Sequence, residues 1–343
     1  MMSNATKMFG EAKSAPTIVA NQLRDNATIL EAIGAKLRQR QPKVVLTCAR
    51  GSSDHAATYA KYLIETYAGI PTASFAPSVS SVYSAKQNMQ GALFLALSQS
   101  GASPDLLASA RAAKRAGACV VALVNVTDSP LAKLADEVIP LHAGPETSVA
   151  ATKSYIATLT ALAQLVAAWT ESDTLKQALA ELPDHLEEAW QLDWQAAVDE
   201  LESARNFFVI GRGIGLGIAQ EAALKFKETA GLHAEAYSAA EVRHGPMAIV
   251  GSGFPVLLFT QDDKTRAGVD AVVEDFAARG AIVMVAGKTY DNTVNLPSVE
   301  GVEAATAPIV FIQSFYKMVN ALAVTRGYDP DSPPHLRKVT ETI

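Results

Sequence analysis

A lysine, a glutamate and a histidine in the second half of the chain could form an acid/base site. In LKFKETAGLHAEAYSAAEVRHGP (224–246), Glu228 follows Lys225 by three positions, and His244 stands ahead of Gly-Pro. A carboxylate can move a proton between adjacent carbons beside a carbonyl, and an imidazole, which titrates near neutrality, can open a sugar ring. The spacing also fits a solvated Lys–Glu pair on a helix, so both interpretations stay open.

Two short loops in the first half carry the donors that a phosphate group needs. The loop SQSGAS (98–103) follows an apolar run and leads into a helix at Pro104, and Gly51-Ser52-Ser53 follows an earlier apolar run. Small hydroxyl groups, a glycine and a helix N-terminus together favour an anion. Ordinary N-capping serines give a similar pattern, but two such loops at one sheet edge favour a phosphate site.

These loops lie within an alternation of short apolar runs and helical patterns. We predict a helix over 15–40, a strand over 43–50, a helix over 54–69, a strand over 92–100, a helix over 104–117 and a strand over 118–125. Alternation of this kind predicts an α/β fold with a parallel sheet flanked by helices.

The same pattern recurs later in the chain at a nearly constant offset. The sequence NFFVIGRG (206–213) matches VVLTCARG (44–51), which gives an offset of 213 − 51 = 162 residues. The same offset aligns the start of the 98–103 loop with TQDDKT (260–265). An offset that holds over about fifty residues predicts two structurally similar halves.

The two halves differ in the residues that could do chemistry. The two carboxylates of TQDDKT would repel a phosphate, so we expect no phosphate site there. At the offset of 162, Glu228 aligns with Thr66 and His244 with Val82. The first half therefore carries the predicted anion site, and the second half carries the predicted proton-transfer groups.

Composition excludes several other classes of protein. The 343 residues include 49% hydrophobic and 19% charged residues, which is typical of a globular protein, and the net charge of −6 argues against a nucleic-acid surface. Cys48 and Cys119 have no metal-ligand spacing and are expected to be buried thiols. The N-terminus has no signal-peptide pattern, and the longest apolar run (155–169) is too short for a membrane span, so we expect a cytoplasmic protein.

Five stretches together resemble the sugar isomerase (SIS) family. They are GSS (51–53), SQSGAS (98–103), ETSVAATKSY (146–155), the 224–246 block and PPHLRKVTETI (333–343). The likeness covers essentially the whole chain and is strongest to the isomerase half of glutamine–fructose-6-phosphate aminotransferases. It implies two similar SIS domains, each a parallel β-sheet flanked by helices in a flavodoxin-like three-layer sandwich, and a homodimer with a shared active site.

The resemblance also implies roles for particular residues. Glu228 would move the proton between C1 and C2 with Lys225 beside it, and His244 would assist ring opening, in the site of the neighbouring subunit. Lys338 would contact the carbonyl of the open-chain sugar. The sugar phosphate would be held by Ser52, Ser53, Ser98, Gln99, Ser100 and Ser103, and the sugar itself by Val149, Ala150 and Ala151.

Departures from the synthase pattern indicate the direction of the reaction. The chain begins Met-Met-Ser and has no room for a glutaminase domain with an N-terminal cysteine, so we expect it not to make ammonia from glutamine. The phosphate loop reads SGASPD and resembles stand-alone members that act on amino-sugar phosphates. The leading hypothesis is a deaminase that converts glucosamine 6-phosphate to fructose 6-phosphate and ammonia.

Three alternatives stay open. Two are enzymes that would use the same glutamate and phosphate loop: a fructosamine-6-phosphate deglycase and an aldose–ketose phosphosugar isomerase. The third is a sugar-phosphate sensor without catalysis. We expect no metal, because the six histidines are scattered, and no cofactor, because GRGIGLG (211–217) does not have the GxGxxG spacing of a dinucleotide loop.

The predicted organisation has five parts. They are an N-terminal helical segment (1–40), a phosphate-binding SIS domain (41–170), a charged helical connector (171–203), a second SIS domain with the acid/base residues (204–328) and a C-terminal tail that closes the site (329–343).

Overall fold

The computed structural model describes residues 3–338 and contains two parallel five-stranded sheets. The described chain forms two compact units, each built from more than one segment. The first-sheet unit comprises residues 17–146, 153–180 and 337–338, and the second-sheet unit comprises residues 3–16, 147–152 and 181–336.

The first sheet has the strand order β2-β1-β3-β4-β5, and all of its strands run parallel. The strands are β1 (Val44–Cys48), β2 (Thr72–Ser74), β3 (Ala92–Ser98), β4 (Cys119–Val124) and β5 (Glu137–Pro140). Every residue of the central strand β3 is buried, because helices cover both faces of a parallel sheet.

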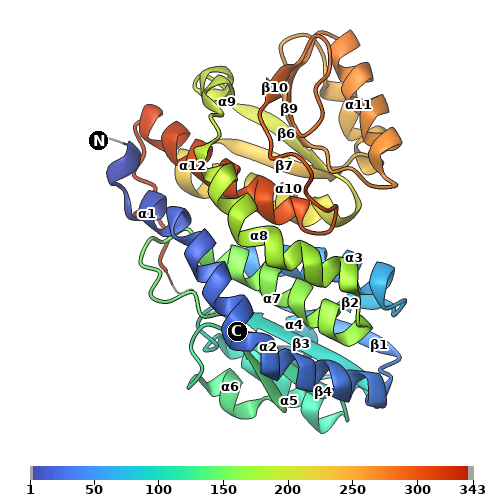
Figure 1. Ribbon diagram of the computed structural model, residues 1–343. Coiled ribbons are helices and arrows are strands. Elements are labelled where there is room, and N and C mark those ends of the chain that lie inside the picture. The colour runs from blue at the N-terminus through green and yellow to red at the C-terminus, as the bar shows by residue number, and fades with distance from the viewer. Residues whose placement is uncertain (1–2, 339–343) are drawn as a thin grey trace. The chain divides into compact units, whose positions relative to one another are not determined.

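Helices pack on both faces of the first sheet (Figure 1). They are α2 (Ala15–Arg40), α3 (Ser52–Tyr67), α4 (Pro77–Ser81), α5 (Pro104–Arg115), α6 (Pro130–Leu134) and α7 (Lys153–Thr170). Figure 1 shows α3 and α7 together on one face and α5 and α6 on the other. The α5 face is closed by an apolar cluster that includes Phe75, Phe94 and Leu106.

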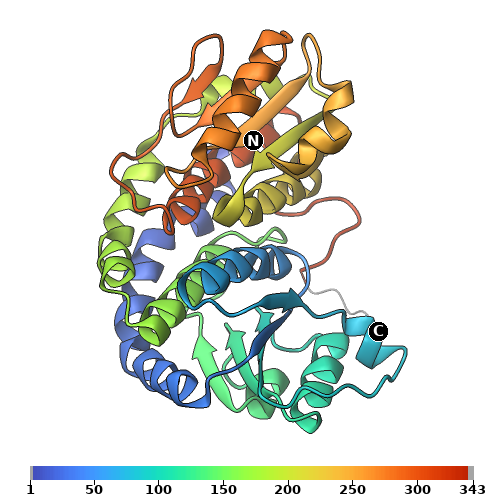
Figure 2. The same ribbon diagram turned by 90° about the vertical axis from the view of Figure 1, so that its right-hand side faces the viewer.

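The second sheet repeats this arrangement with the strand order β10-β9-β8-β6-β7. Its strands are β6 (Asn206–Gly211), β7 (His233–Ser238), β8 (Pro255–Phe259), β9 (Ile282–Ala286) and β10 (Val294–Leu296). Figures 1 and 2 show α10 (Leu216–Ala230) and α12 (Ala307–Thr325) side by side on one face, and α11 (Arg266–Ala278) covers the other. The unit also contains α1 (Lys7–Lys13) and α9 (Gln195–Leu201), and α8 (Asp173–Gln191) belongs in part to each unit.

The predicted internal repeat is confirmed at the level of elements. Moving α5 by 162 positions gives residues 266–277, and α11 spans Arg266–Ala278. Moving β1 by the same number gives residues 206–210, and β6 spans Asn206–Gly211. Both sheets have the order in which the first strand of the unit lies beside its second and third strands, as in flavodoxin-like folds. The predicted fold class is therefore confirmed.

Two local expectations are corrected. The first strand ends at Cys48 rather than at residue 50, and α3 begins at Ser52 rather than at residue 54, because Gly51 turns the chain with φ of +56°. In addition, the run at 155–169 is expected to be the longest apolar one, but α12 is the described helix that has the length and composition of a membrane span. Since 83% of its most apolar window is buried within the protein, it has the character of a core helix.

Candidate functional site

The two hydroxyl-rich loops lie at the carboxyl ends of neighbouring strands in the first-sheet unit. Residues 49–53 follow β1, residues 98–103 follow β3, and β1 pairs with β3. The sheet order sends the chain after β1 toward β2 on one side and the chain after β3 toward β4 on the other. Such a reversal leaves a crevice at the carboxyl edge, where α/β proteins bind ligands.

The 98–103 loop is held in shape by its own groups. The buried Ser98 hydroxyl accepts a hydrogen bond from the Gly101 amide at 3.0 Å, and the Gly101 carbonyl accepts from the Leu131 amide at 3.1 Å. Gly101 has φ of +61°, and a Cβ at this position would lie 2.2 Å from the Ser129 Oγ. The loop therefore requires glycine here, for its backbone angle and for its close approach to the next loop.

The other predicted phosphate ligands surround the N-termini of two helices. Ser52 and Ser53 are the first residues of α3, and Ser103 is the N-cap of α5, where its side chain makes no capping hydrogen bond. Gln99 and Ser100 are partly exposed. Helix N-termini carry unpaired amides and a partial positive charge, so this group of residues can bind an anion.

An ion pair joins the loop after β1 to the first turn of α5. The Arg50 guanidinium donates to the Asp105 Oδ2 from Nε at 2.8 Å and from Nη2 at 2.7 Å, and the Asp105 side chain is completely buried. The other oxygen of Asp105 accepts from the Leu106 amide at 2.7 Å. Arg50 therefore neutralises a carboxylate in the first turn of α5, which would otherwise oppose an anion at that helix end.

The corresponding loop of the second-sheet unit is filled by its own carboxylate. Asp263 accepts hydrogen bonds from the Thr265 amide at 2.7 Å, the Thr265 hydroxyl at 2.5 Å and the Gln261 side-chain amide at 3.1 Å. These are the kinds of donor that a phosphate would use. The Asp263 carboxylate already uses these donors, which gives a physical reason to expect no phosphate site in the second half.

The candidate acid/base residues of α10 form a buried network. Lys225 is 1% exposed, and its Nζ lies 3.3 Å from the Glu221 Oε1 and 2.5 Å from the Glu228 Oε2. Burial alone would lower the pKa of Lys225, but the two carboxylates outweigh it and raise that pKa above its ordinary value. Lys225 is thus a fixed cation that holds Glu228. The alternative of a solvated surface pair is wrong.

The network continues away from Glu228. The Glu221 side chain is completely buried and accepts a hydrogen bond from the Tyr316 hydroxyl of α12 at 3.1 Å. The Glu228 side chain is 22% exposed, so one end of the network reaches the surface of the unit. A carboxylate in this position can meet a small molecule while its orientation is fixed from behind.

His244 ends a short 3-10 helix, Glu241–His244, directly before Gly245 with φ of +137°. The histidine is exposed, and within residues 3–338 its side chain makes no hydrogen bond. The structure of this unit therefore does not bring His244 to Glu228 by any direct contact.

The segment around Val149, Ala150 and Ala151 belongs to the second-sheet unit and is tied down at its start. Glu11 of α1 accepts hydrogen bonds from the amides of Thr147 and Ser148. The Val149 amide donates to the Asp331 carbonyl at 3.3 Å. Ala150 is buried, whereas Val149 and Ala151 are partly exposed. This backbone is fixed well enough to present a constant surface.

Lys338 is held by a buried carboxylate in the first-sheet unit. Its Nζ donates to the Glu146 Oε2 at 3.0 Å, and Glu146 also accepts from the Ser154 hydroxyl at 2.6 Å and the Ser154 amide at 3.1 Å. The remainder of the predicted closing tail, residues 339–343, lies outside the described residues.

The structure thus groups the predicted residues by unit. The phosphate ligands and Lys338 belong to the first-sheet unit, and Lys225, Glu228, His244 and residues 149–151 belong to the second-sheet unit. Sequence reasoning missed the residues that support them: Arg50, Asp105, Glu221, Tyr316, Glu11 and Glu146. Only Glu221 left a signal, its i,i+4 spacing to Lys225. Residues 3–338 contain no group of three or more His, Cys, Asp or Glu side chains that could hold a metal ion.

Comparison with known proteins identifies the family. The SIS domain matches residues 38–168 and 200–326, which contain the two sheets. The glutamine–fructose-6-phosphate aminotransferases of Thermococcus kodakarensis and Pyrococcus horikoshii are each 32% identical over 96% of this chain. The chain covers 57% and 54% of their lengths, so it spans about half of the curated relatives that it matches.

Solved structures agree. A candidate phosphosugar isomerase from Silicibacter pomeroyi is 45% identical with a TM-score of 0.91, and the match covers 95% of this chain and 100% of that one. The C-terminal domain of a glucosamine–fructose-6-phosphate aminotransferase from Francisella tularensis is 26% identical with a TM-score of 0.85, over 96% and 98% of the two chains. Each of the two sheets lies within a region that matches the SIS domain, so this chain belongs to the SIS domain family.

Proposed function

We propose that the protein is a phosphosugar isomerase-type enzyme that acts on an amino-sugar phosphate. The finer proposal is a deaminase that converts glucosamine 6-phosphate and water to fructose 6-phosphate and ammonia. The observation that carries the enzymatic proposal is the buried network on α10, in which Lys225 holds the partly exposed carboxylate of Glu228 at 2.5 Å. A sensor that only binds sugar phosphate has no need of such a fixed carboxylate.

The preformed loops of the first-sheet unit support the phosphate half of the proposal. The loop at 98–103 is shaped by Gly101, the helices α3 and α5 begin directly after the two loops, and Arg50 neutralises the nearby Asp105. We propose that Ser52, Ser53, Ser100 and Ser103 donate to the phosphate oxygens, with Ser98 and Gln99 shaping the loop around them.

The proposed chemistry begins with ring opening, assisted by His244, which gives an aldehyde at C1. Glu228 removes the proton from C2, and a proton is returned to C1, so that the double bond moves to the C2–N bond. Water adds to this C2 imine and ammonia leaves, which yields fructose 6-phosphate. Lys225 keeps Glu228 oriented by its charge, and Lys338 contacts the sugar carbonyl oxygen.

The names of similar proteins support this substrate class. The relatives at 32% identity are named as isomerizing glutamine–fructose-6-phosphate aminotransferases, and the solved structure at 45% identity is described as a candidate phosphosugar isomerase. Together they favour a sugar 6-phosphate with an amino group at C2 over other phosphorylated ligands.

The test is an assay of the purified chain with glucosamine 6-phosphate in D₂O, which follows ammonia, fructose 6-phosphate and deuterium at C1. We expect all three products, and we expect Glu228→Gln to remove them while Glu274→Gln, an exposed glutamate of α11, leaves them unchanged. Turnover that persists in Glu228→Gln would refute the proton-transfer role.

Two further substrates separate the enzyme classes. Conversion of fructose 6-phosphate to glucose 6-phosphate without an amine would indicate a plain isomerase, and turnover of a fructosamine 6-phosphate alone would indicate a deglycase. Binding of glucosamine 6-phosphate without any turnover would indicate a sensor.

We also propose that His244 acts in the neighbouring subunit of a homodimer. The exposure of its side chain, and the lack of side-chain hydrogen bonds within residues 3–338, support a role outside its own unit. Mixing the inactive variants Glu228→Gln and His244→Ala after mild dissociation should restore activity, because a mixed dimer contains one intact site. Failure of a verified mixed dimer to recover activity would place both residues in one subunit's site.

A further inference from the structure

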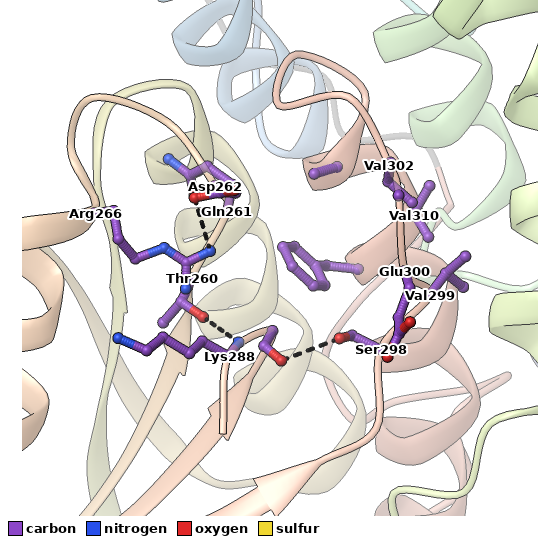
Figure 3. A pocket seen from close by; sticks show the side chains of 14 residues that line it. Thr260, Gln261, Asp262, Arg266, Lys288, Ser298, Val299, Glu300, Val302 and Val310 are labelled. Atoms are coloured by element: carbon purple, nitrogen blue, oxygen red, sulfur yellow. Dashed lines mark hydrogen bonds and ion pairs between the residues drawn. The ribbon is translucent and has the colours of Figure 1, made fainter. Parts of the chain in front are cut away.

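A separate cavity lies in the second-sheet unit at the carboxyl ends of β8 and β9 (Figure 3). Its volume is about 240 Å³, and it is lined by residues 260–262 after β8, residues 287–288 after β9, the segment 298–302 and the first turns of α12. None of the residues to which we assign catalysis or phosphate binding lines it. The cavity therefore has no part in the proposed reaction.

Arg266, the first residue of α11, is the charged group of this cavity that keeps donor atoms without an acceptor among residues 3–338. Its side chain is 19% exposed, and its Nε and Nη1 atoms are buried without a hydrogen-bond partner among residues 3–338. Its Nη2 lies 3.6 Å from the Asp262 Oδ1, but the Asp262 side chain is 91% exposed. Figure 3 shows the guanidinium directed inward from α11, between Asp262 and Thr260.

The second cation at this edge is already neutralised. The Lys288 Nζ donates to Asp270 at 3.0 Å, and the Tyr290 hydroxyl donates to the same carboxylate at 2.5 Å. Burial alone would raise the pKa of Asp270, but the hydrogen bonds from Tyr290 and Lys288 hold it below its ordinary value. The Arg266 charge also lowers the pKa of Asp270. Lys288 donates directly to that carboxylate, whereas the Arg266 Nε and Nη1 atoms donate to no acceptor among residues 3–338, so Arg266 keeps donors for a ligand.

The charge balance favours one negative charge on the ligand. Buried guanidinium donors without acceptors are unfavourable until an anion supplies them. Asp262 and Glu300 are exposed and line the cavity, so they would repel a doubly charged phosphate more strongly than a singly charged carboxylate. A planar carboxylate also matches the fork of a guanidinium.

The remaining wall is apolar. Val299, Val310 and Phe311 are buried around the cavity, and Val302 is partly buried. The volume is below the roughly 300–1,000 Å³ of sites for drug-sized ligands, so the ligand is compact. These features define a small molecule with a charged head and an apolar body.

We propose that this cavity binds a compact organic monocarboxylate, whose carboxylate pairs with the Arg266 guanidinium and whose apolar body packs against Val299, Val310 and Phe311. The site lies in the half of the chain in which the carboxylate of Asp263 accepts the hydrogen bonds of the loop after β8. It would give the protein a binding site for a second class of metabolite.

The test uses the full chain with benzoate as the probe and inorganic phosphate as the comparison. Binding of each is measured by calorimetric titration and by the change in thermal unfolding. We expect benzoate to bind and phosphate to bind more weakly. Arg266→Met should weaken benzoate binding by about tenfold or more. Arg279 is the C-cap residue at the other end of α11, and its guanidinium pairs with Asp275. The matched control Arg279→Met should leave binding unchanged.

A second variant protects the test against misfolding. Val302→Trp should fill the cavity and remove benzoate binding without touching the charge. Without the probe, Arg266→Met should have an unchanged or higher Tm, because it removes a buried charge that lacks acceptors. The proposal is overturned if benzoate at about 10 mM does not bind, or if phosphate binds more tightly than benzoate at the same site. It is also overturned if Arg266→Met and Val302→Trp bind benzoate as tightly as the unchanged protein does.

Discussion

Replacement of Lys225 by methionine tests the central feature of the candidate site. Methionine fills a similar volume but carries no charge, so Glu221, whose side chain is completely buried, would lose the cation that lies 3.3 Å away. Removing one partner of a buried ion pair costs about 3–5 kcal/mol. For a unit of this size, about 2–4 °C in Tm accompany each kcal/mol, so Tm should fall by about 6–20 °C.

The assay is urea unfolding followed by circular dichroism, with calorimetry for Tm. The matched double variant Glu221→Gln/Lys225→Met removes both charges, while the amide at position 221 can still accept the hydrogen bond from Tyr316. It should recover most of the lost stability. Activity should stay low in both variants, because Glu228 has lost the group that orients it.

The reasoning is refuted if Lys225→Met costs less than about 1 kcal/mol, the level of an exposed pair. It is also refuted if the double variant is no more stable than the single variant. Either result would mean that the Lys225 charge is not needed to balance Glu221.

Three further predictions concern the first-sheet unit. Arg50→Ala should raise the KM for the phosphosugar about tenfold or more with a smaller effect on kcat, because it leaves the Asp105 charge unpaired beside the phosphate loop. The double variant Arg50→Ala/Asp105→Asn should restore KM. Gly101→Ala should lower the free energy of unfolding in urea by about 1–3 kcal/mol and weaken phosphate binding, because φ is +61° and the alanine Cβ would meet Ser129. Unchanged phosphate binding would contradict a preformed loop. Burial raises the pKa of the Cys48 thiol to about 12, from an unfolded value near 9. The stability that this group contributes is therefore complete below pH 9 and is lost as the pH rises toward 12, by at most about 1.4 kcal/mol per pH unit. Cys48→Ala should remove this alkaline loss of stability.

Local pattern was enough to predict much of the fold. The helix over 15–40 matches α2 (Ala15–Arg40), and the constant offset of 162 anticipated that β6, α10 and α11 repeat β1, α3 and α5. Such features depend on hydrophobic periodicity and on turn residues, which act over a few positions. The boundary errors at Cys48 and Ser52 arose at Gly51, whose positive φ turns the chain earlier than periodicity alone indicates.

The candidate site has features that local sequence pattern could not predict. Lys225 and Glu228 have the spacing of an ordinary surface pair, and only packing under α12 makes Lys225 one of the most buried side chains in the protein. Likewise, the sequence TQDDKT predicts repulsion of a phosphate. Only the structure shows that the Asp263 carboxylate already accepts hydrogen bonds from the donors of its own loop.

The sequence by itself determined the repeated α/β architecture and the difference between a hydroxyl-rich first half and an acid/base second half. Tertiary structure alone decided which charges are paired. Arg50 and Asp105 are 55 positions apart and Glu146 and Lys338 are 192 positions apart, whereas Arg266 keeps buried donors that have no acceptor in the described part of the chain. The physical reason is that burial and charge pairing depend on which distant segments fold against each other, and no local spacing encodes that.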